Sequence, residues 1–291
     1  MPASWARLSC LETDAAGWPR TATWGGMARP LFTDGFGDFV AVEVKGFAPR
    51  WVLQDIWGIG DPARRSEAQQ EKLAFNRARP GGPAAVEENP HTLRYTQALE
   101  HPRFRWATRQ LELWKREPRA RFTFRMNRIS SFDPELLCLI HPLPCDGALP
   151  RVSSGGMGFT PFTEQIPGTC RDYFGIDGWA HYATPDGHWL WVTRDAPLVT
   201  FDGPHPKSRL SGPPSRPGRV VTVLYDNFWY TNFQGDSPGV MEFQFELVWR
   251  RSLGGDEEAS ALAEALVAEP VMVLNPSLPE HPLFLRHLFR P

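Results

Sequence analysis

The stretch that decides the fold runs from Val220 to Val248 and reads VVTVLYDNFWYTNFQGDSPGVMEFQFELV. Its second half alternates strictly between apolar and polar side chains, as a half-buried antiparallel strand does. The apolar face carries Met241, Phe243, Phe245 and Leu247, and the polar face carries Glu242, Gln244 and Glu246. With the strand that begins at Val220 and the Gly/Pro turn between them, this segment predicts one edge of a β-sandwich.

The corner between the two strands is rich in short polar side chains beside a large indole. It contains Asp226, Asn227, Trp229, Thr231 and Asn232. Sugar hydroxyls need hydrogen-bond donors and acceptors, and the C–H faces of a sugar pack on aromatic rings, so the corner is a candidate sugar-binding or interface site. The alternative is an Asx-type turn that ends a strand, with Trp229 in the core.

Composition also favours a large β protein. The 291 residues, 32.9 kDa in all, include 12 Trp, 5 Tyr and 19 Phe, and 29 Pro and 25 Gly interrupt the chain often enough for many short strands. A formal net charge of −2 and a pI near 6.5 give no electrostatic basis for binding a phosphate backbone, so we expect no nucleic-acid partner.

Three blocks resemble the C-terminal β-rich region of glycoside hydrolase family 38 α-mannosidases, in the same order. They are GWPRTATWGGMARPLF at residues 17–32, the segment from Phe162 to Val199, and DNFWYTNF followed by FQFELVWR. The resemblance implies an all-β fold, a large antiparallel sandwich of the galactose-mutarotase type known as the supersandwich. It also implies that the loop residues Arg171, Asp172 and Tyr173 contact a sugar or a catalytic domain, at the same end of the sandwich as the corner.

In the resembled family a catalytic barrel precedes this region and carries an HxD zinc pair and an Asp nucleophile. This chain contains no HxD. The resemblance therefore implies a carbohydrate-associated region without a complete catalytic set, with no cofactor of its own because the zinc belongs to the missing barrel. The implied partners are a mannoside-like carbohydrate and an α-mannosidase-type catalytic domain. A fragment, a late start site and a stand-alone accessory protein all fit this pattern.

A hairpin is predicted around Thr184-Pro185-Asp186-Gly187. Parity places Tyr182, Trp189 and Trp191 on one face, where they form either a stacking platform for a sugar ring or ordinary core. The other face carries Trp179, His181, His188 and Leu190. Two imidazoles without a carboxylate or thiolate partner fall short of a zinc set, so we interpret both histidines as structural.

Two other functions fit the expected fold. A sugar epimerase of the mutarotase type would use a Glu base and a His acid in a concave sheet, and His141 or His181 with Glu164 or Glu242 could supply them. A structural or oligomerisation module for a separate hydrolase would need neither. A His/Glu pair in a concave site would favour the epimerase, and a flat aromatic surface would favour the structural module.

The chain is divided into a β-supersandwich domain over residues 1–252 and a C-terminal part of the same unit over 253–291, with a helix, a short strand and a docking tail. The segment of about 63–79, rich in helix formers, predicts a surface helix or an ordered excursion from the sandwich. A second helix is predicted from Asp256, with Ala261, Leu262, Ala265 and Leu266 as its apolar stripe. Four scattered cysteines, no signal peptide and no membrane-length apolar run indicate a cytoplasmic protein.

Overall fold

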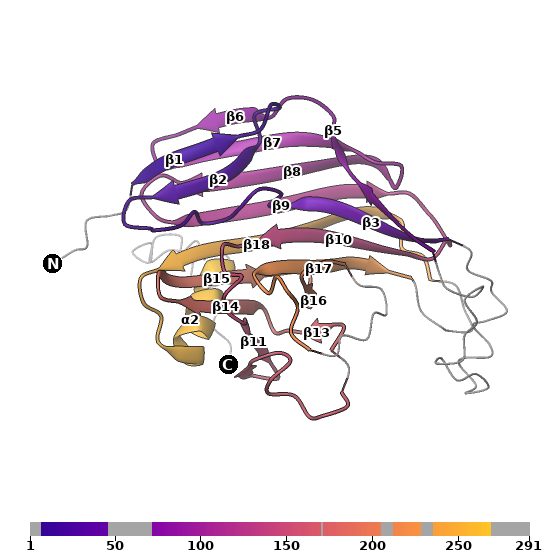
Figure 1. The fold of residues 1–291 in the computed structure, drawn as a ribbon. Coiled ribbons are helices and arrows are strands. Elements are labelled where there is room, and N and C mark those ends of the chain that lie inside the picture. The colour runs from indigo at the N-terminus through magenta and orange to yellow at the C-terminus, as the bar shows by residue number, and fades with distance from the viewer. Residues whose placement is uncertain (1–6, 46–71, 170, 205–211, 228–234, 269–291) are drawn as a thin grey trace, which may run out of the picture.

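A computed structural model describes residues 7–45, 72–169, 171–204, 212–227 and 235–268. In these ranges two antiparallel sheets lie face to face, with a short hairpin of β1 (Leu8–Thr13) and β2 (Pro19–Trp24) beside them, as Figure 1 shows. The hairpin is tied to the end of the larger sheet by the Trp24 indole N–H, which donates to the Trp114 carbonyl at 2.7 Å. The expected large antiparallel β-sandwich is confirmed.

The larger sheet has ten strands among the described residues, and all its pairings are antiparallel. Its central strands are the ones that alternate most strictly in sequence, and they are also the longest. In spatial order the sheet runs β12 (Met157–Phe159), β11 (Arg151–Ser154), β14 (Trp179–Thr184), β15 (Gly187–Thr193), β18 (Gly239–Arg250), β9 (Arg119–Arg128), β8 (Phe104–Trp114), β7 (Thr92–Glu100) and β5 (Arg79–Pro80), and β6 (Ala85–Glu88) also pairs with β7.

The smaller sheet has six strands in the same part of the chain and covers one face of the larger one. It is rich in Val, Leu and Phe, and both of its faces are buried near its centre. Its order is β13 (Phe174–Gly175), β16 (Leu198–Phe201), β17 (Arg219–Asp226), β10 (Glu135–Pro142), β3 (Asp38–Lys45) and β4 (Lys72–Arg77).

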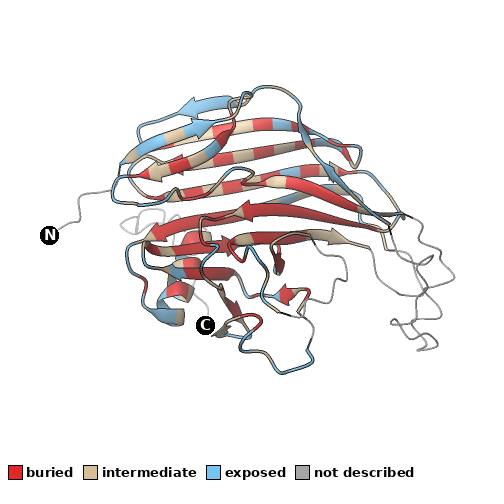
Figure 2. Ribbon diagram, in the orientation of Figure 1, coloured by how far each residue is buried: buried red, intermediate tan, exposed pale blue. Residues whose placement is uncertain are grey.

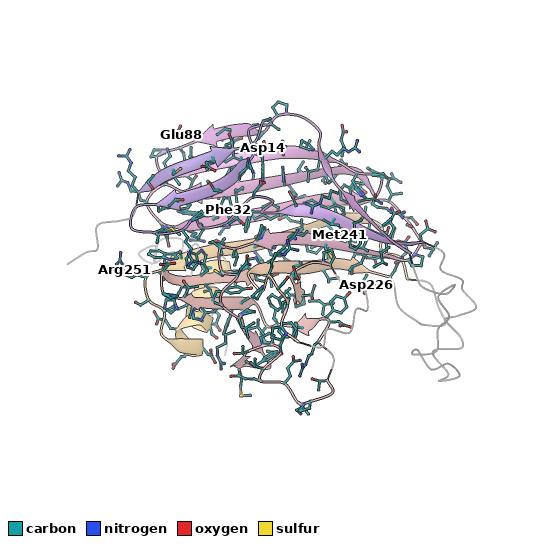
Figure 3. All side chains as sticks on the ribbon, in the orientation of Figure 1. Asp14, Phe32, Glu88, Asp226, Met241 and Arg251 are labelled. Atoms are coloured by element: carbon teal, nitrogen blue, oxygen red, sulfur yellow. The ribbon has the colours of Figure 1, made fainter. Side chains whose placement is uncertain are left out.

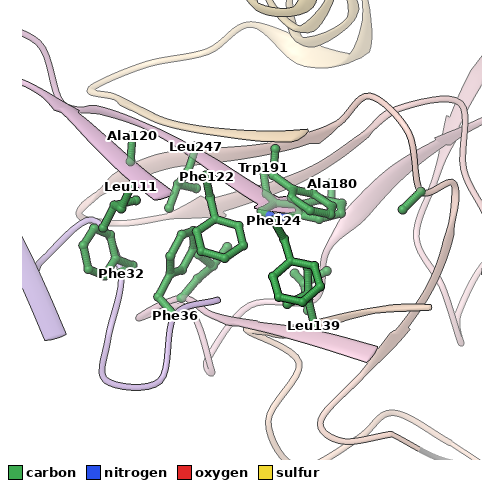
Figure 4. Close-up of a cluster of buried hydrophobic side chains, with 14 of the residues drawn as sticks. Phe32, Phe36, Leu111, Ala120, Phe122, Phe124, Leu139, Ala180, Trp191 and Leu247 are labelled. Atoms are coloured by element: carbon green, nitrogen blue, oxygen red, sulfur yellow. The ribbon is translucent and has the colours of Figure 1, made fainter. Parts of the chain in front are cut away.

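The main core fills the space between the two sheets. Figure 4 shows Phe122, Phe124 and Trp191 of the larger sheet beside Phe36 and Leu139, and all five are buried. In Figure 2 the buried residues follow the strands that face each other, whereas β6 is exposed throughout. Aromatic side chains bury the most apolar area per residue, so this layer dominates the stability of the sandwich.

Gly37 shows how closely the chain approaches this core. It adopts φ +77°, and a Cβ at this position would lie 2.2 Å from the Phe122 ring. Both the backbone conformation and the space therefore require glycine at the turn that leads into β3.

The helix α2 (Gly255–Val267) packs on the outer face of the larger sheet. Its buried side chains are Ala259, Ala263 and Leu266, which contact Trp179, Leu190, Val192 and Val248. The predicted start and the acidic first turn are confirmed, but the predicted stripe is wrong at Ala261 and Ala265, which are exposed. Among the described residues no helix is both long and apolar enough to cross a membrane.

The helix predicted over about 63–79 is wrong in its second part. Residues 72–77 form β4, which pairs with β3 from Val40↔Arg77 to Lys45↔Lys72, and 79–80 form β5. Pairing with an exposed sheet edge supplies backbone hydrogen bonds that outweigh a weak intrinsic helix preference. Residues 63–71, the predicted strand at 271–274 and the tail at 276–291 lie outside the described residues.

Candidate functional site

The corner residue Asn227 has a structural role. Its side-chain oxygen accepts the Glu135 backbone N–H at 2.7 Å. Its amide donates to the carbonyls of Asp133 at 3.0 Å and Ser131 at 3.3 Å. Asn227 thus ties the end of β17 to the segment before β10, as the Asx-type alternative requires. Asp226 ends β17 opposite Leu136, while Trp229, Thr231 and Asn232 lie outside the described residues.

The loop candidates lie on a different part of the smaller sheet. Asp172 is buried, with 6% of its surface exposed, and Tyr173 packs with Leu198 on the outer apolar face of that sheet. The next residue, Phe174, pairs with Val199 of β16, and Val199 in turn pairs with Thr222 of β17. Thr222 lies four positions before Asp226. Because β13 runs parallel to β17, the chain before Phe174, including Arg171, leads toward the other end of β17. The register therefore places this loop toward the opposite end of β17 from Asp226.

The hairpin residues follow the predicted faces. Tyr182 pairs with Trp189, and together with Trp191 they are fully buried between the sheets, so they are core and not a sugar platform. On the opposite face His181 Nε2 lies 2.9 Å from His188 Nδ1. Burial and the neighbouring His188 lower the pKa of His181 to about 4, so it is neutral at pH 7.

The residues considered for epimerase chemistry do not meet in a concave site. His141 points into the core, with ring centroids 4.6 Å from Phe245 and 5.1 Å from Phe36, and burial lowers its pKa to about 3. Glu242 lies on the open face of the larger sheet and pairs with Arg125. Glu164 and His181 both lie near Arg151, but Glu164 forms an ion pair with that arginine and His181 is paired with His188.

A cleft of about 810 Å³ opens where the β1–β2 hairpin and the edges of the two sheets meet. We call it the charged cleft, because five arginines and four aspartates line it. They are Arg20, Arg77, Arg109, Arg216 and Arg219, and Asp14, Asp34, Asp38 and Asp146. Figure 3 shows that Asp14, in the hairpin turn, lies far from Asp226 at the corner. The cleft and the predicted corner are therefore separate places.

Arg109 is the most constrained residue of the charged cleft. It lies on the inner face of β8, and its Nε and Nη2 both donate to Gln97 Oε1, at 3.0 and 2.7 Å. Its guanidinium carbon lies 4.0 Å from the centroid of the Trp18 ring. The side chain is 6% exposed, and burial lowers its pKa. A buried guanidinium held by an amide and an indole has a fixed orientation, which is what a binding site requires.

Asp38 links the two sheets across the charged cleft. It is the first residue of β3, and its carboxylate pairs with Arg77 at 3.0 Å and with Arg109 at 3.4 Å. Burial raises the pKa of Asp38, although both arginines act in the opposite direction. A carboxylate between two guanidiniums at the mouth of a cleft can accept hydrogen bonds from a hydroxyl-rich ligand.

The sequence contains one signal for this site, in the pattern of β8. The inward-facing positions of β8 are Ala107, Arg109, Leu111 and Leu113. An arginine therefore lies on the otherwise apolar face of this strand. Gln97 occupies the facing inward position of β7. Burying two polar side chains among apolar ones costs free energy unless they form hydrogen bonds, so such a pair indicates a candidate functional site.

Metal binding has no candidate in the part of the chain that the structure describes. No group of three or more His, Cys, Asp or Glu side chains there could hold an ion.

Comparison with known proteins identifies the fold. No protein-family model matches the chain, and no curated protein matches it. An α-mannosidase from Enterococcus faecalis V583 matches with a TM-score of 0.52 and 10% identity, over 86% of this chain and 29% of that chain. A protein of glycosyl hydrolase family 38 from Enterococcus faecalis matches with a TM-score of 0.50 and 9% identity, over 86% of this chain and 30% of that chain.

A weaker likeness, with a TM-score of 0.41 and 10% identity, is to a protein described as an aldose 1-epimerase from Escherichia coli K12, over 85% of this chain and 99% of that chain. The chain thus has a β-rich fold that also occurs within family 38 α-mannosidases, and it spans about 30% of their length. The resemblance inferred from the three sequence blocks is confirmed at the level of the fold.

Proposed function

We propose that this chain is the carbohydrate-associated C-terminal region of an α-mannosidase-like glycoside hydrolase, without hydrolytic activity of its own. The observation that carries the proposal is the fold match, which takes in 86% of this chain but only 29% of the solved α-mannosidase. An α-mannosidase-type catalytic domain would be its partner and would bring the zinc. Free Cys10, Cys138 and Cys145 support a cytoplasmic location.

The chemistry of the charged cleft supports contact with a sugar. Asp38 offers carboxylate oxygens, and Arg77 and Arg109 offer guanidinium N–H groups within the same space. Sugar hydroxyls both donate and accept, so a mixed set of this kind can bind a saccharide along its polar edge. The same set is poorly suited to hydrolysis, because glycosidases need two carboxyl groups across the bond that breaks, one of them tuned as an acid.

We expect the purified chain to show no turnover of 4-nitrophenyl α-mannoside, with or without added zinc. The physical reason is that the sequence has no HxD, and the Asp38 carboxylate, which lines the charged cleft, is paired with two arginines. Release of nitrophenol would be followed by absorbance, with an intact α-mannosidase as the positive control. Zinc-dependent turnover by the chain alone would contradict the proposal.

A further inference from the structure

Arg219 differs from the other arginines of the charged cleft. Each of the other four has a carboxylate partner: Arg20 pairs with Asp34 at 2.8 Å and Arg216 with Asp202 at 2.7 Å, while Arg77 and Arg109 share Asp38. Among the described residues Arg219 forms no ion pair and no side-chain hydrogen bond. The cleft therefore contains one guanidinium that has no ion-pair partner among the described residues.

The surroundings of Arg219 make that charge costly. Arg219 is the first residue of β17, opposite Pro142 of β10, and is half-buried. Burial lowers the pKa of its guanidinium, and the nearby cations Arg216 and Arg77 act in the same direction, against the weaker influence of Asp202 and Asp38. A partly desolvated cation beside two like charges gains free energy when an anion approaches it.

The remaining acidic groups of the charged cleft do not supply that anion. The Asp14 carboxylate accepts the backbone N–H groups of Ala16 and Trp18, at 2.8 and 2.9 Å, and so is committed to the hairpin turn. Asp146 is exposed at the rim and forms no ion pair among the described residues. The charged cleft therefore has five arginines and four aspartates, and one of these aspartates, Asp14, is hydrogen-bonded to backbone N–H groups.

Stacking on a sugar ring is not the main interaction that this cleft offers. Trp18 is 3% exposed, with Arg109 over one face and the Phe122 ring at its edge, 6.5 Å between centroids. No face of this indole is free for a pyranose, whereas polar and charged groups are abundant. The cleft is therefore better suited to a charged, hydroxyl-rich ligand than to a neutral sugar bound on an aromatic platform.

We propose that the charged cleft binds a saccharide that carries an anionic group, a carboxylate or a phosphate, with the anion held by Arg219 and the sugar hydroxyls directed to Asp38 and Arg109. This rests on the proposed carbohydrate association and goes beyond it, because it specifies the charge of the ligand. Arg219 can contact either anion through two parallel N–H groups, as guanidiniums commonly do.

Calorimetric titration of the full chain tests this with four probes: mannose, mannuronate, mannose 6-phosphate and inorganic phosphate. We expect at least one anionic sugar to bind about tenfold or more tightly than mannose, and its affinity to fall as salt is added. Preference for the uronate identifies a carboxylate ligand, and preference for the sugar phosphate identifies a phosphate ligand. Both results support the proposal.

Variants assign the effect to Arg219. Arg219→Gln should remove the preference for the anionic sugar over mannose, while Arg219→Lys should keep part of the preference because it keeps the charge. Arg116→Gln, at an exposed arginine of the β8–β9 turn outside the cleft, should change neither. Thermal melts of each variant show whether it remains folded.

Three results would overturn the inference. These are equal affinity for mannose and both anionic sugars, a preference that survives in Arg219→Gln, and inorganic phosphate binding as tightly as the sugar phosphate. If mannose and both anionic sugars bind with equal, measurable affinity, the inference about the anion is wrong but the proposed carbohydrate association is still supported. Failure of every saccharide to bind would remove that association together with the inference.

Discussion

Replacing Glu135 by alanine should lower the free energy of unfolding by about 3–5 kcal/mol. Glu135 and Arg128 form an ion pair at 2.7 Å, and both side chains are fully buried at one end of the sandwich. Burial raises the pKa of Glu135 even though Arg128 and Arg103 lie beside it. Removing the carboxylate leaves the Arg128 guanidinium buried, with Asp236 as its remaining acidic partner, and that is more costly than losing an exposed pair.

Urea unfolding followed by tryptophan fluorescence would measure this effect. Asp133→Ala is the matched control, because its carboxylate is 82% exposed and lies 3.9 Å from Arg103, so the loss should stay below about 1 kcal/mol. The double variant Arg128→Met/Glu135→Leu should recover part of the stability, since an apolar pair avoids the desolvation cost of the ion pair, although Asp236 then loses its arginine partner. A loss below about 1 kcal/mol for Glu135→Ala would show that this cluster is not buried as described.

The second large effect is on acid stability and comes from His141. Burial lowers the pKa of this imidazole from 6.5 to about 3 in the folded chain. As the pH falls below about 6.5, the unfolded chain takes up a proton at this residue and the folded chain does not. The stabilisation is therefore complete above pH 6.5 and is lost progressively as the pH falls toward 3. By pH 4 we expect His141 alone to have cost about 3 kcal/mol.

Unfolding curves at pH 7, 5.5 and 4 would test this, compared with His141→Phe, which keeps an aromatic ring in the same cluster. The phenylalanine variant should lose less stability between pH 7 and pH 4 than the parent protein, whatever its stability at pH 7. His91→Gln, at an exposed histidine, should follow the parent curve. Equal acid losses in the parent and His141→Phe would mean that His141 is protonated in the folded state.

Much of the fold could be predicted because its strands carry their own pattern. The alternation from Met241 to Leu247 and the parity of the hairpin at Tyr182 and Trp189 depend only on neighbouring residues. The helix predicted over about 63–79 is wrong over residues 72–77, because the strand there forms by pairing with β3, which is distant in sequence. The burial of Ala263 in place of Ala265 likewise depends on how α2 meets the sheet.

The site could be predicted less well, and for a related reason. Asn227 has the hydrogen-bonding chemistry of a sugar-binding residue, but its partners are backbone groups near Glu135 that come from another part of the chain. Arg109, Asp38 and Arg219 lie on three different strands, and only the packing of one sheet on the other brings them to a single cleft. No local sequence pattern shows that these three residues meet, although an arginine on the apolar face of β8 indicates that Arg109 is unusual.

The most direct test of carbohydrate association at the charged cleft is calorimetric titration of the full chain with methyl α-mannoside and α-mannobiose. We expect saturable binding to the parent protein and to Asp133→Asn, an exposed aspartate at the other end of the sandwich, and binding reduced about tenfold or more in Asp38→Asn. Absence of binding to the parent protein, or full affinity in Asp38→Asn, would contradict the account.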